Sequence, residues 1–252
     1  NIRPNGFVVL NIDDNFFELH KKIAHKKNLK VISFGKKNVK ANLKLIYIKP
    51  FGKQFKINSS FNNKNKYFLL SNDFQNNIYN ILATLAVISI YKNIFKLHKN
   101  IFLNIKIPVG RGDHSVIKIN NKKVNLIDQS YNSNPLSLKS AIKNYDKIDT
   151  NKSKKYLLIG DMLELGSHSV KLHKSIAPLV NQTKIDKVFV KGKMASLIFK
   201  NISKAKKGRI LANKLQIIEL IRKDLNNNDY LMMKASLATG FNKIVKDIKG
   251  FN

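Results

Sequence analysis

Short apolar segments alternate with longer amphipathic segments through the second half of this 252-residue chain. This alternation restricts the fold more than any other feature of the sequence. The apolar segments cover residues 155–159, 187–190, 209–211 and 230–233, and helical patterns follow each of them. A strand, a helix and a second strand in this order form a βαβ unit, whose two strands lie parallel. The second half is therefore predicted to be a Rossmann-like α/β domain with a mostly parallel sheet.

The first half contains strands, one hairpin and one apolar helix. Residues 41–57 alternate about a Lys-Pro-Phe-Gly-Lys turn, which indicates an antiparallel hairpin. Residues 76–91 carry apolar side chains spread widely around a helix, which predicts burial on several sides. Further short strands are predicted at residues 8–10, 31–34 and 67–70.

A Pro/Gly-rich segment at residues 108–112 separates the two halves. Such a break predicts a domain boundary, with one domain at residues 1–107 and the other at residues 108–252. Arg111 stands between two glycines in this segment, and its guanidinium group is suited to a phosphate or a carboxylate. An arginine in a solvated loop is the commoner explanation.

Residues 125–142 contain the polar segment that most resembles a binding loop. A strand-like run ends at Asp128, six polar or aromatic residues follow, and a helical pattern begins at Pro135. In open α/β sheets, ligands bind in the loops beyond the carboxyl ends of the strands. Asn and Ser also form ordinary turns and helix caps, so the pattern alone leaves both interpretations open.

The chain has 47 Lys and Arg residues against 15 Asp and Glu residues, a formal net charge of +32. Such a charge is typical of nucleic-acid-binding proteins, and a basic nucleic-acid-binding module is kept as an alternative. However, the lysines are spread through every segment, and Asn and Ile share the A/T-rich codons of Lys. Base composition of the genome therefore explains the charge without such a partner.

Several features bear on the cellular environment. The chain has no cysteine, which favours a reducing cytoplasm, and its first residues do not resemble a signal peptide. The longest apolar stretch, residues 78–91, contains Asn80 and is short for a membrane span. A cytoplasmic protein without a membrane span is expected.

The remaining candidate residues lie where strands end. Residues 160–166 form a Gly-bounded turn after a strand, where Asp161 and Glu164 could suggest a metal site, although solvated loop acids are commoner. His173 is expected to be a packing residue. Lys234 and Ser236 follow the last strand and are better placed to bind an anion.

Taken together, these segments resemble the Mur ligases of peptidoglycan synthesis. The family's D-[DE]-S-Y-N-A-N-P signature is similar to residues 128–135, and its G-D-M-x-E-L-G to residues 160–166. Its V-L-N-x-D motif is similar to residues 9–13 and its hinge V-x-G-R to residues 109–111, and its terminal V-K-G-S is matched loosely by residues 233–236. The order and spacing of the motifs agree over essentially the whole chain.

The resemblance implies an ATP-dependent amide ligase with Mg²⁺ as a cofactor. The family member with the most similar motifs joins D-alanyl-D-alanine to UDP-N-acetylmuramoyl-tripeptide through an acyl phosphate. The resemblance implies catalytic roles for Arg111 and Lys234. It places Asn11, Asn76 and Asn77 beside the nucleotide base, Arg111 and Asp128 beside the phosphates and ribose, and Tyr131, Asn132, Asn134 and Ser236 beside the dipeptide or acyl phosphate.

Three residues depart from the family pattern. Gln129 replaces a second acid, Asn76 replaces a histidine, and Ala235 replaces the glycine of the K-G-S motif, where backbone freedom is useful. The family's phosphate-binding loop and Mg²⁺ ligands are expected upstream of Asn1, so the chain alone is expected to be inactive. We expect a monomer. The alternatives within the enzyme class are a sister Mur ligase or a folylpolyglutamate synthase-like ligase.

Overall fold

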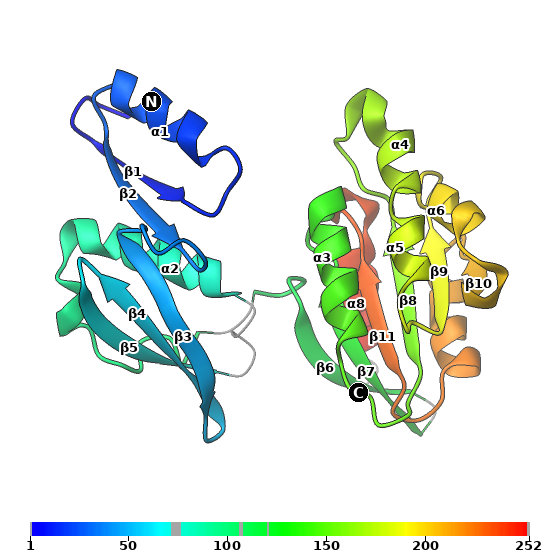
Figure 1. Cartoon of the computed structure of the whole chain (residues 1–252). Coiled ribbons are helices and arrows are strands. Elements are labelled where there is room, and N and C mark those ends of the chain that lie inside the picture. Colours follow the sequence, from blue (N-terminus) through cyan, green and yellow to red (C-terminus); the bar gives the residue numbers. More distant parts are fainter. Residues whose placement is uncertain (1, 72–76, 106–107, 120, 251–252) are drawn as a thin grey trace. The chain divides into compact units, whose positions relative to one another are not determined.

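The structure is a computed structural model, which describes residues 2–71, 77–105, 108–119 and 121–250. The chain divides into two compact units, residues 1–106 and 107–252 (Figure 1). Each unit has its own sheet and its own core.

The described strands of unit 1 form one mixed sheet in the order β1-β2-β3-β4-β5. β1 and β2 are parallel, and the expected hairpin is present as antiparallel β3 and β4, with β5 antiparallel to β4. The elements are β1 (Phe7–Asn11), α1 (Phe17–Lys26), β2 (Lys30–Gly35), β3 (Leu43–Phe51), β4 (Gln54–Phe61), β5 (Lys64–Leu70), α2 (Ile78–Tyr91) and a 3-10 turn, η2 (Ile94–Lys96).

The apolar helix expected in the first half is α2, and it packs against β1, β2 and β3. Its buried side chains include Ile81, Leu82 and Leu85, which explains the wide apolar face seen in the sequence. Phe68 of β5 contacts Phe102 edge to face, with ring centroids 5.4 Å apart. These contacts form the core of unit 1.

The described strands of unit 2 form one sheet in the order β10-β9-β8-β11-β7-β6, parallel except for the β6–β7 pair. This confirms the Rossmann-like fold. The strands are β6 (Asp113–Ile119), β7 (Lys122–Gln129), β8 (Lys155–Gly160), β9 (Lys187–Lys191), β10 (Lys207–Ile210) and β11 (Tyr230–Lys234). The helices are α3 (Pro135–Asp146), α4 (Ser169–Lys174), α5 (Ala177–Asn181), α6 (Ala195–Asn201), α7 (Lys214–Glu219) and α8 (Phe241–Lys249).

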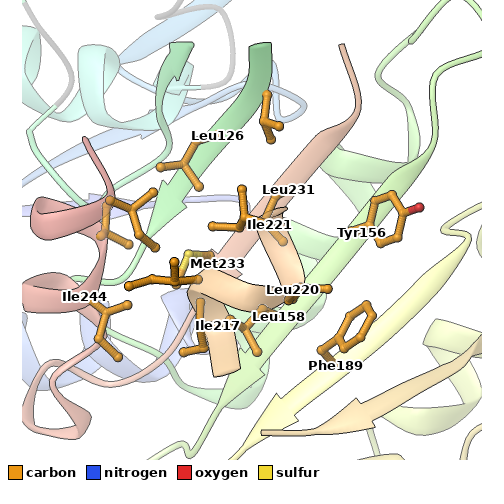
Figure 2. Close-up of a cluster of buried hydrophobic side chains, with 14 of the residues drawn as sticks. Leu126, Tyr156, Leu158, Phe189, Ile217, Leu220, Ile221, Leu231, Met233 and Ile244 are labelled. Carbon is orange, nitrogen blue, oxygen red and sulfur yellow. The ribbon is translucent and has the colours of Figure 1, made fainter. Parts of the chain in front are cut away.

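Helices cover both faces of this sheet, as Figure 1 shows. On one face, α7 and α8 pack over a cluster that includes Leu158, Ile217, Met233 and Ile244 (Figure 2). On the other face, α3, α5 and α6 contribute to a second cluster with the alternate side chains of the same strands. Because both faces of the sheet are buried, the central strands β8 and β11 carry mainly apolar side chains, which is the pattern that the sequence showed.

Two of the expected helices differ from the structure. The helix expected to run to about residue 180 is divided into α4 and α5, because Pro178 in the first turn of α5 lacks a backbone N–H and blocks a continuous helix. The helix expected at residues 214–225 is α-helical only to Glu219 and continues as a π-helical segment, η5 (Leu220–Asp224).

Short 3-10 turns complete unit 2, namely η3 (Gly166–His168), η4 (Lys204–Lys206) and η6 (Leu237–Thr239). Among the residues that the structure describes, no helix has the length and apolar character to cross a bilayer.

Candidate functional site

The carboxyl ends of β7, β11 and β8 lie side by side in unit 2. In the sheet register, Lys234 of β11 pairs with Gln129 of β7 on one side and with Ile159 of β8 on the other. The polar loop after β7, the segment after β8 and the segment after β11 therefore begin at the same edge of the sheet. This is the edge where ligands bind in open α/β folds.

Lys234 is a buried cation at this edge. Its side chain is enclosed, and its Nζ atom donates a hydrogen bond to the Asn132 carbonyl oxygen at 2.8 Å. Burial, together with the positive charge of Arg111, lowers the pKa of Lys234 to about 8. Arg111 is itself exposed, and its positive charge beside the buried Lys234 ammonium group is unfavourable unless an anion joins the two cations. Lys234 and Arg111 therefore form a candidate anion site.

Arg111 contacts the polar loop at Tyr131. Its guanidinium carbon is 4.2 Å from the centre of the Tyr131 ring, within the range of a cation–π contact. The backbone between them is tightly packed, because Gly110 has a φ of +76° and a Cβ there would lie 2.9 Å from the Tyr131 nitrogen. The Tyr131 N–H also donates to the Gly110 carbonyl oxygen at 3.0 Å. The glycine thus lets Arg111 stack on Tyr131.

Ser236 links the three strand ends. Its hydroxyl donates to the Ser133 carbonyl oxygen at 3.0 Å and accepts from the Leu163 N–H at 3.0 Å. The preceding residue, Ala235, is buried, and a Cβ on Gly160 would lie only 2.6 Å from the Ala235 Cβ. The methyl group that replaces the family's glycine is thus accommodated against a glycine of the neighbouring strand.

Asp128 is buried at the end of β7 and has several partners. One carboxylate oxygen accepts hydrogen bonds from the Ser130 N–H and hydroxyl, at 2.9 and 2.6 Å. The other oxygen lies 3.4 Å from the Lys249 Nζ atom. Asp128 therefore shapes the start of the polar loop as well as lying at the candidate site.

The two loop asparagines also have structural partners. Asn134 caps α3, since its side-chain oxygen accepts from the Ser137 N–H at 2.8 Å and the Ser137 hydroxyl accepts from the Asn134 N–H at 3.0 Å. The Asn132 side-chain oxygen accepts from the Ser133 N–H at 2.7 Å. The cap is the ordinary turn chemistry that the sequence left open for this loop. Contact of either side chain with a substrate stays a prediction.

The segment after β8 is organised by hydrogen bonds within the fold. An Asp161 carboxylate oxygen accepts from the Ala195 N–H at 2.7 Å, and Glu164 has a φ of +62°. Within the described ranges, no group of three or more His, Asp or Glu side chains is arranged to hold a metal ion.

His173 is fully buried beneath this segment and contacts the backbone on both sides of its ring. Its Nε2 atom accepts from the Met162 N–H at 3.0 Å, and its Nδ1 atom lies 2.8 Å from the Ser169 carbonyl oxygen. The histidine is a packing residue, as expected.

Unit 1 holds the candidate residues for the nucleotide base. Asn11 ends β1, and its side-chain oxygen accepts from the Asp13 N–H at 3.0 Å. Asn77 precedes α2, and its side-chain oxygen accepts from the Asn80 amide at 3.4 Å. Asn76 lies outside the described residues. Contacts of these residues with a nucleotide stay predictions.

Asp13 of unit 1 belongs to the V-L-N-x-D match in the sequence, but the sequence assigned it no role. Its carboxylate accepts from the backbone N–H groups of Lys36, Lys37 and Asn38 at 2.6, 3.0 and 2.9 Å, and from the Tyr79 hydroxyl at 3.1 Å. Burial acts to raise the pKa of Asp13, but these hydrogen bonds together hold it below its usual value. These hydrogen bonds to Asp13 hold the loop after β2 beside the end of β1.

Asp113 and Lys249 of unit 2 were also missed. The Lys249 Nζ atom lies 2.6 Å from an Asp113 carboxylate oxygen, and the other oxygen accepts from the Gly110 N–H at 2.6 Å. No short motif joins residues that are this far apart in sequence. We call residues 110–112 the Arg111 turn. In the sequence, the only hint of this contact was that Asp113 follows that turn directly.

Two family models match the chain. The Mur ligase middle domain matches residues 1–88, and the Mur ligase glutamate ligase domain matches residues 115–237. A UDP-N-acetylmuramoyl-tripeptide–D-alanyl-D-alanine ligase from Buchnera aphidicola subsp. Baizongia pistaciae is 32% identical over 98% of this chain and 52% of the relative. The corresponding ligase from Bacillus subtilis is 31% identical over 50% of this chain and 28% of the relative.

Solved structures share the fold. The MurF ligase from Thermotoga maritima in complex with ADP has a TM-score of 0.72 at 21% identity, over 98% of this chain and 54% of that one. MurF from Acinetobacter baumannii has a TM-score of 0.76 at 18% identity, over 98% of this chain and 52% of that one. The chain thus spans about half the length of the relatives that it matches from end to end. The family models, the Buchnera relative and the fold together place this chain in the Mur ligase family.

Proposed function

We propose that this chain contributes half of an ATP-dependent ligase that joins D-alanyl-D-alanine to UDP-N-acetylmuramoyl-tripeptide. The support is the Buchnera relative of that name, which aligns with 98% of the chain. The single structural observation that carries the proposal is the enclosed Lys234 beside Arg111 at the carboxyl edge of the parallel sheet. A ligase that forms an acyl phosphate needs cations at such a position.

The proposed reaction requires neutralisation of charge. ATP would phosphorylate the terminal carboxylate of the tripeptide, the dipeptide amine would attack the acyl phosphate, and phosphate would leave as the amide forms. Negative charge collects on the phosphoryl oxygens throughout, and fixed cations stabilise it. We assign this role to Lys234 and Arg111. With its pKa lowered to about 8, the Lys234 amine is still mostly in the charged ammonium form at pH 7.

The other assignments follow from place in the fold. We propose that Asp128 contacts the ribose or phosphates, and that Tyr131, Asn132, Asn134 and Ser236 line the dipeptide side of the site. Tyr131 is open to solvent, with 42% of its surface exposed, and Asn132 and Asn134 are exposed too, whereas Ser236 is buried. Ser236 would therefore act chiefly by holding the strand ends together.

Nucleotide contacts are proposed within each unit separately. We propose that residues 1–107 are the end of the central ATP-binding domain, with Asn11, Asn76 and Asn77 beside the base, and that residues 108–252 are the C-terminal domain. The ADP in the Thermotoga relative supports the use of ATP. Mg²⁺ would add to the neutralisation of phosphate charge. We propose that its ligands lie outside this chain, and we assign it no residue here.

Reading the gene upstream of the Asn1 codon would test the proposal most directly. An in-frame G-T-[NS]-G-K-[TS] loop is expected, since Mur ligases bind the phosphates of ATP with that loop. The joined polypeptide should then release phosphate from ATP only when both the tripeptide nucleotide and D-alanyl-D-alanine are present. The 252-residue chain alone should neither release phosphate from ATP nor form the amide bond. Ligation by the isolated chain, or a joined protein that adds only another amino acid, would contradict the proposal.

The cellular setting follows from the proposed substrates. ATP and a UDP-linked precursor are cytoplasmic metabolites, so we propose a cytoplasmic, monomeric enzyme. Light scattering on the joined polypeptide tests the oligomeric state. A salt series of filter binding to single-stranded and duplex DNA tests the alternative of a basic nucleic-acid-binding module. Binding that is independent of the DNA sequence and weakens steeply as the salt concentration rises would favour that alternative.

A further inference from the structure

We propose that Lys249, the last residue of α8, is a positioning residue that holds the Arg111 turn in place. Its Nζ atom lies 2.6 Å from one Asp113 carboxylate oxygen and 3.4 Å from one Asp128 carboxylate oxygen. The Lys249 side chain is 26% exposed, and those of Asp113 and Asp128 are 22% and 2% exposed. One ammonium group thus joins two acids that are largely shielded from water.

Both acids lead directly to the turn. The second Asp113 oxygen accepts a hydrogen bond from the Gly110 N–H at 2.6 Å. The Asp128 carbonyl oxygen accepts from the Gly112 N–H at 2.7 Å. Arg111 is therefore flanked on each side by a backbone N–H that is bonded to a residue in contact with Lys249.

The turn depends on such external contacts because of its own backbone. Gly110 and Gly112 have φ values of +76° and +104°, a region that glycine enters easily and leaves easily. A segment with this freedom loses much conformational entropy when it is ordered. The Lys249–Asp113 ion pair offsets part of that entropy cost. The backbone of Arg111 is then held in the position from which its side chain stacks on Tyr131.

The competing explanation is that Lys249 only anchors α8 to the domain. A second ion pair on the same helix offers a matched control. Lys214 of α7 contacts Asp247 of α8 at 2.6 Å, but the two side chains are 44% and 47% exposed. Both lysines secure α8, and only Lys249 contacts an acid that is bonded to the Arg111 turn.

The test uses amide hydrogen exchange, measured by NMR on the 252-residue chain carrying Lys249→Met, Lys249→Arg or Lys214→Met. Lys249→Met keeps the length of the side chain but removes its charge. We expect the Gly110 amide to exchange about tenfold faster in Lys249→Met, the factor for losing a contact to a charged group. Lys249→Arg should restore slow exchange at Gly110, because it restores the cation.

The control fixes the interpretation. Lys214→Met should leave the Gly110 and Gly112 amides unchanged. The proposal is overturned if Gly110 exchange does not change in Lys249→Met, or if Lys214→Met speeds it equally. It is also overturned if all amides of β6 and β7 speed up together, because that result reports a general loss of stability.

A second readout rests on the proposed function. In the joined ligase, Lys249→Met should lower kcat more than it changes the KM for ATP, and Lys249→Arg should recover most of the loss. If the unaltered ligase shows no ligation, the proposed function fails, and the exchange of the Gly110 amide still decides the positioning role. The two failures are therefore distinguishable.

Discussion

Replacement of Lys234 by methionine should change how the stability of the protein depends on pH. Lys234 is almost completely buried at the end of β11, and burial together with the nearby Arg111 lowers its pKa to about 8. The folded state therefore disfavours the ammonium form, which the unfolded state accepts freely. Methionine has a similar length and no charge, so the variant removes this difference between the two states.

The size of the effect follows from the two pKa values. A pKa lowered from 10.5 to about 8 corresponds to roughly 3 kcal/mol, at about 1.36 kcal/mol per pKa unit. Between pH 8 and pH 10.5 the unfolded chain binds a proton at Lys234 that the folded chain does not, so stability rises with pH in this window. Integrated from pH 7 to pH 10, the gain is about 2.5 kcal/mol.

At pH 7 the variant should differ little from the native chain. Removing the unfavourable charge stabilises Lys234→Met, but loss of the hydrogen bond to the Asn132 carbonyl oxygen costs about 1–3 kcal/mol. The informative quantity is therefore the difference in unfolding free energy between the two proteins as pH rises. This difference should move by about 2.5 kcal/mol in favour of the native chain between pH 7 and pH 10.

Urea unfolding at half-unit steps from pH 7 to pH 10 measures this difference. Other titrating groups, including Tyr156 with its raised pKa, are present in both proteins and cancel in the comparison. Lys191→Met, at the carboxyl end of β9, which β8 separates from β11, serves as a control for the general effect of losing one positive charge. A difference between native and Lys234→Met chains that stays constant from pH 7 to pH 10 would refute the reasoning.

Three further substitutions test the roles of Arg111, Tyr145 and His173. Arg111→Ala in the joined ligase should lower kcat by about 10²- to 10³-fold, because it removes a cation from the proposed phosphoryl site, while thermal unfolding changes little; unchanged kinetics would remove the assignment. Tyr145→Phe should cost about 1–2 kcal/mol in urea unfolding, since the buried hydroxyl lies 3.0 and 2.9 Å from two strand carbonyl oxygens. His173→Leu should cost about 1–3 kcal/mol in the same assay by leaving the Met162 N–H without its partner, and an unaltered midpoint would argue against the structural role.

The strand order of unit 2 was not contained in any single segment of the sequence. Periodicity predicted the strands and their parallel arrangement, because residues two or four apart respond to the same local geometry. It did not place β11 between β8 and β7. That order depends on which helices can cover which face, a property of the whole domain.

In the polar loop, too, some features followed from the local sequence and others only from the folded structure. Its position after β7 and the start of α3 at Pro135 followed from the sequence, because turn and cap residues act on their immediate neighbours. The use of Asn134 as a cap and the burial of Asp128 required the structure. A side chain with several polar groups nearby can satisfy any of them, and only the fold shows which partner it has.

The sequence by itself determined the fold class, the approximate places of the strands in unit 2 and the family, because short-range patterns and motif spacing encode all three. Tertiary structure alone decided that Lys234 is enclosed beside Arg111, and that Lys249 joins Asp113 to Asp128 across more than 100 residues. Electrostatic interactions depend on distance in space and on exclusion of water, and neither quantity is written in the order of the residues.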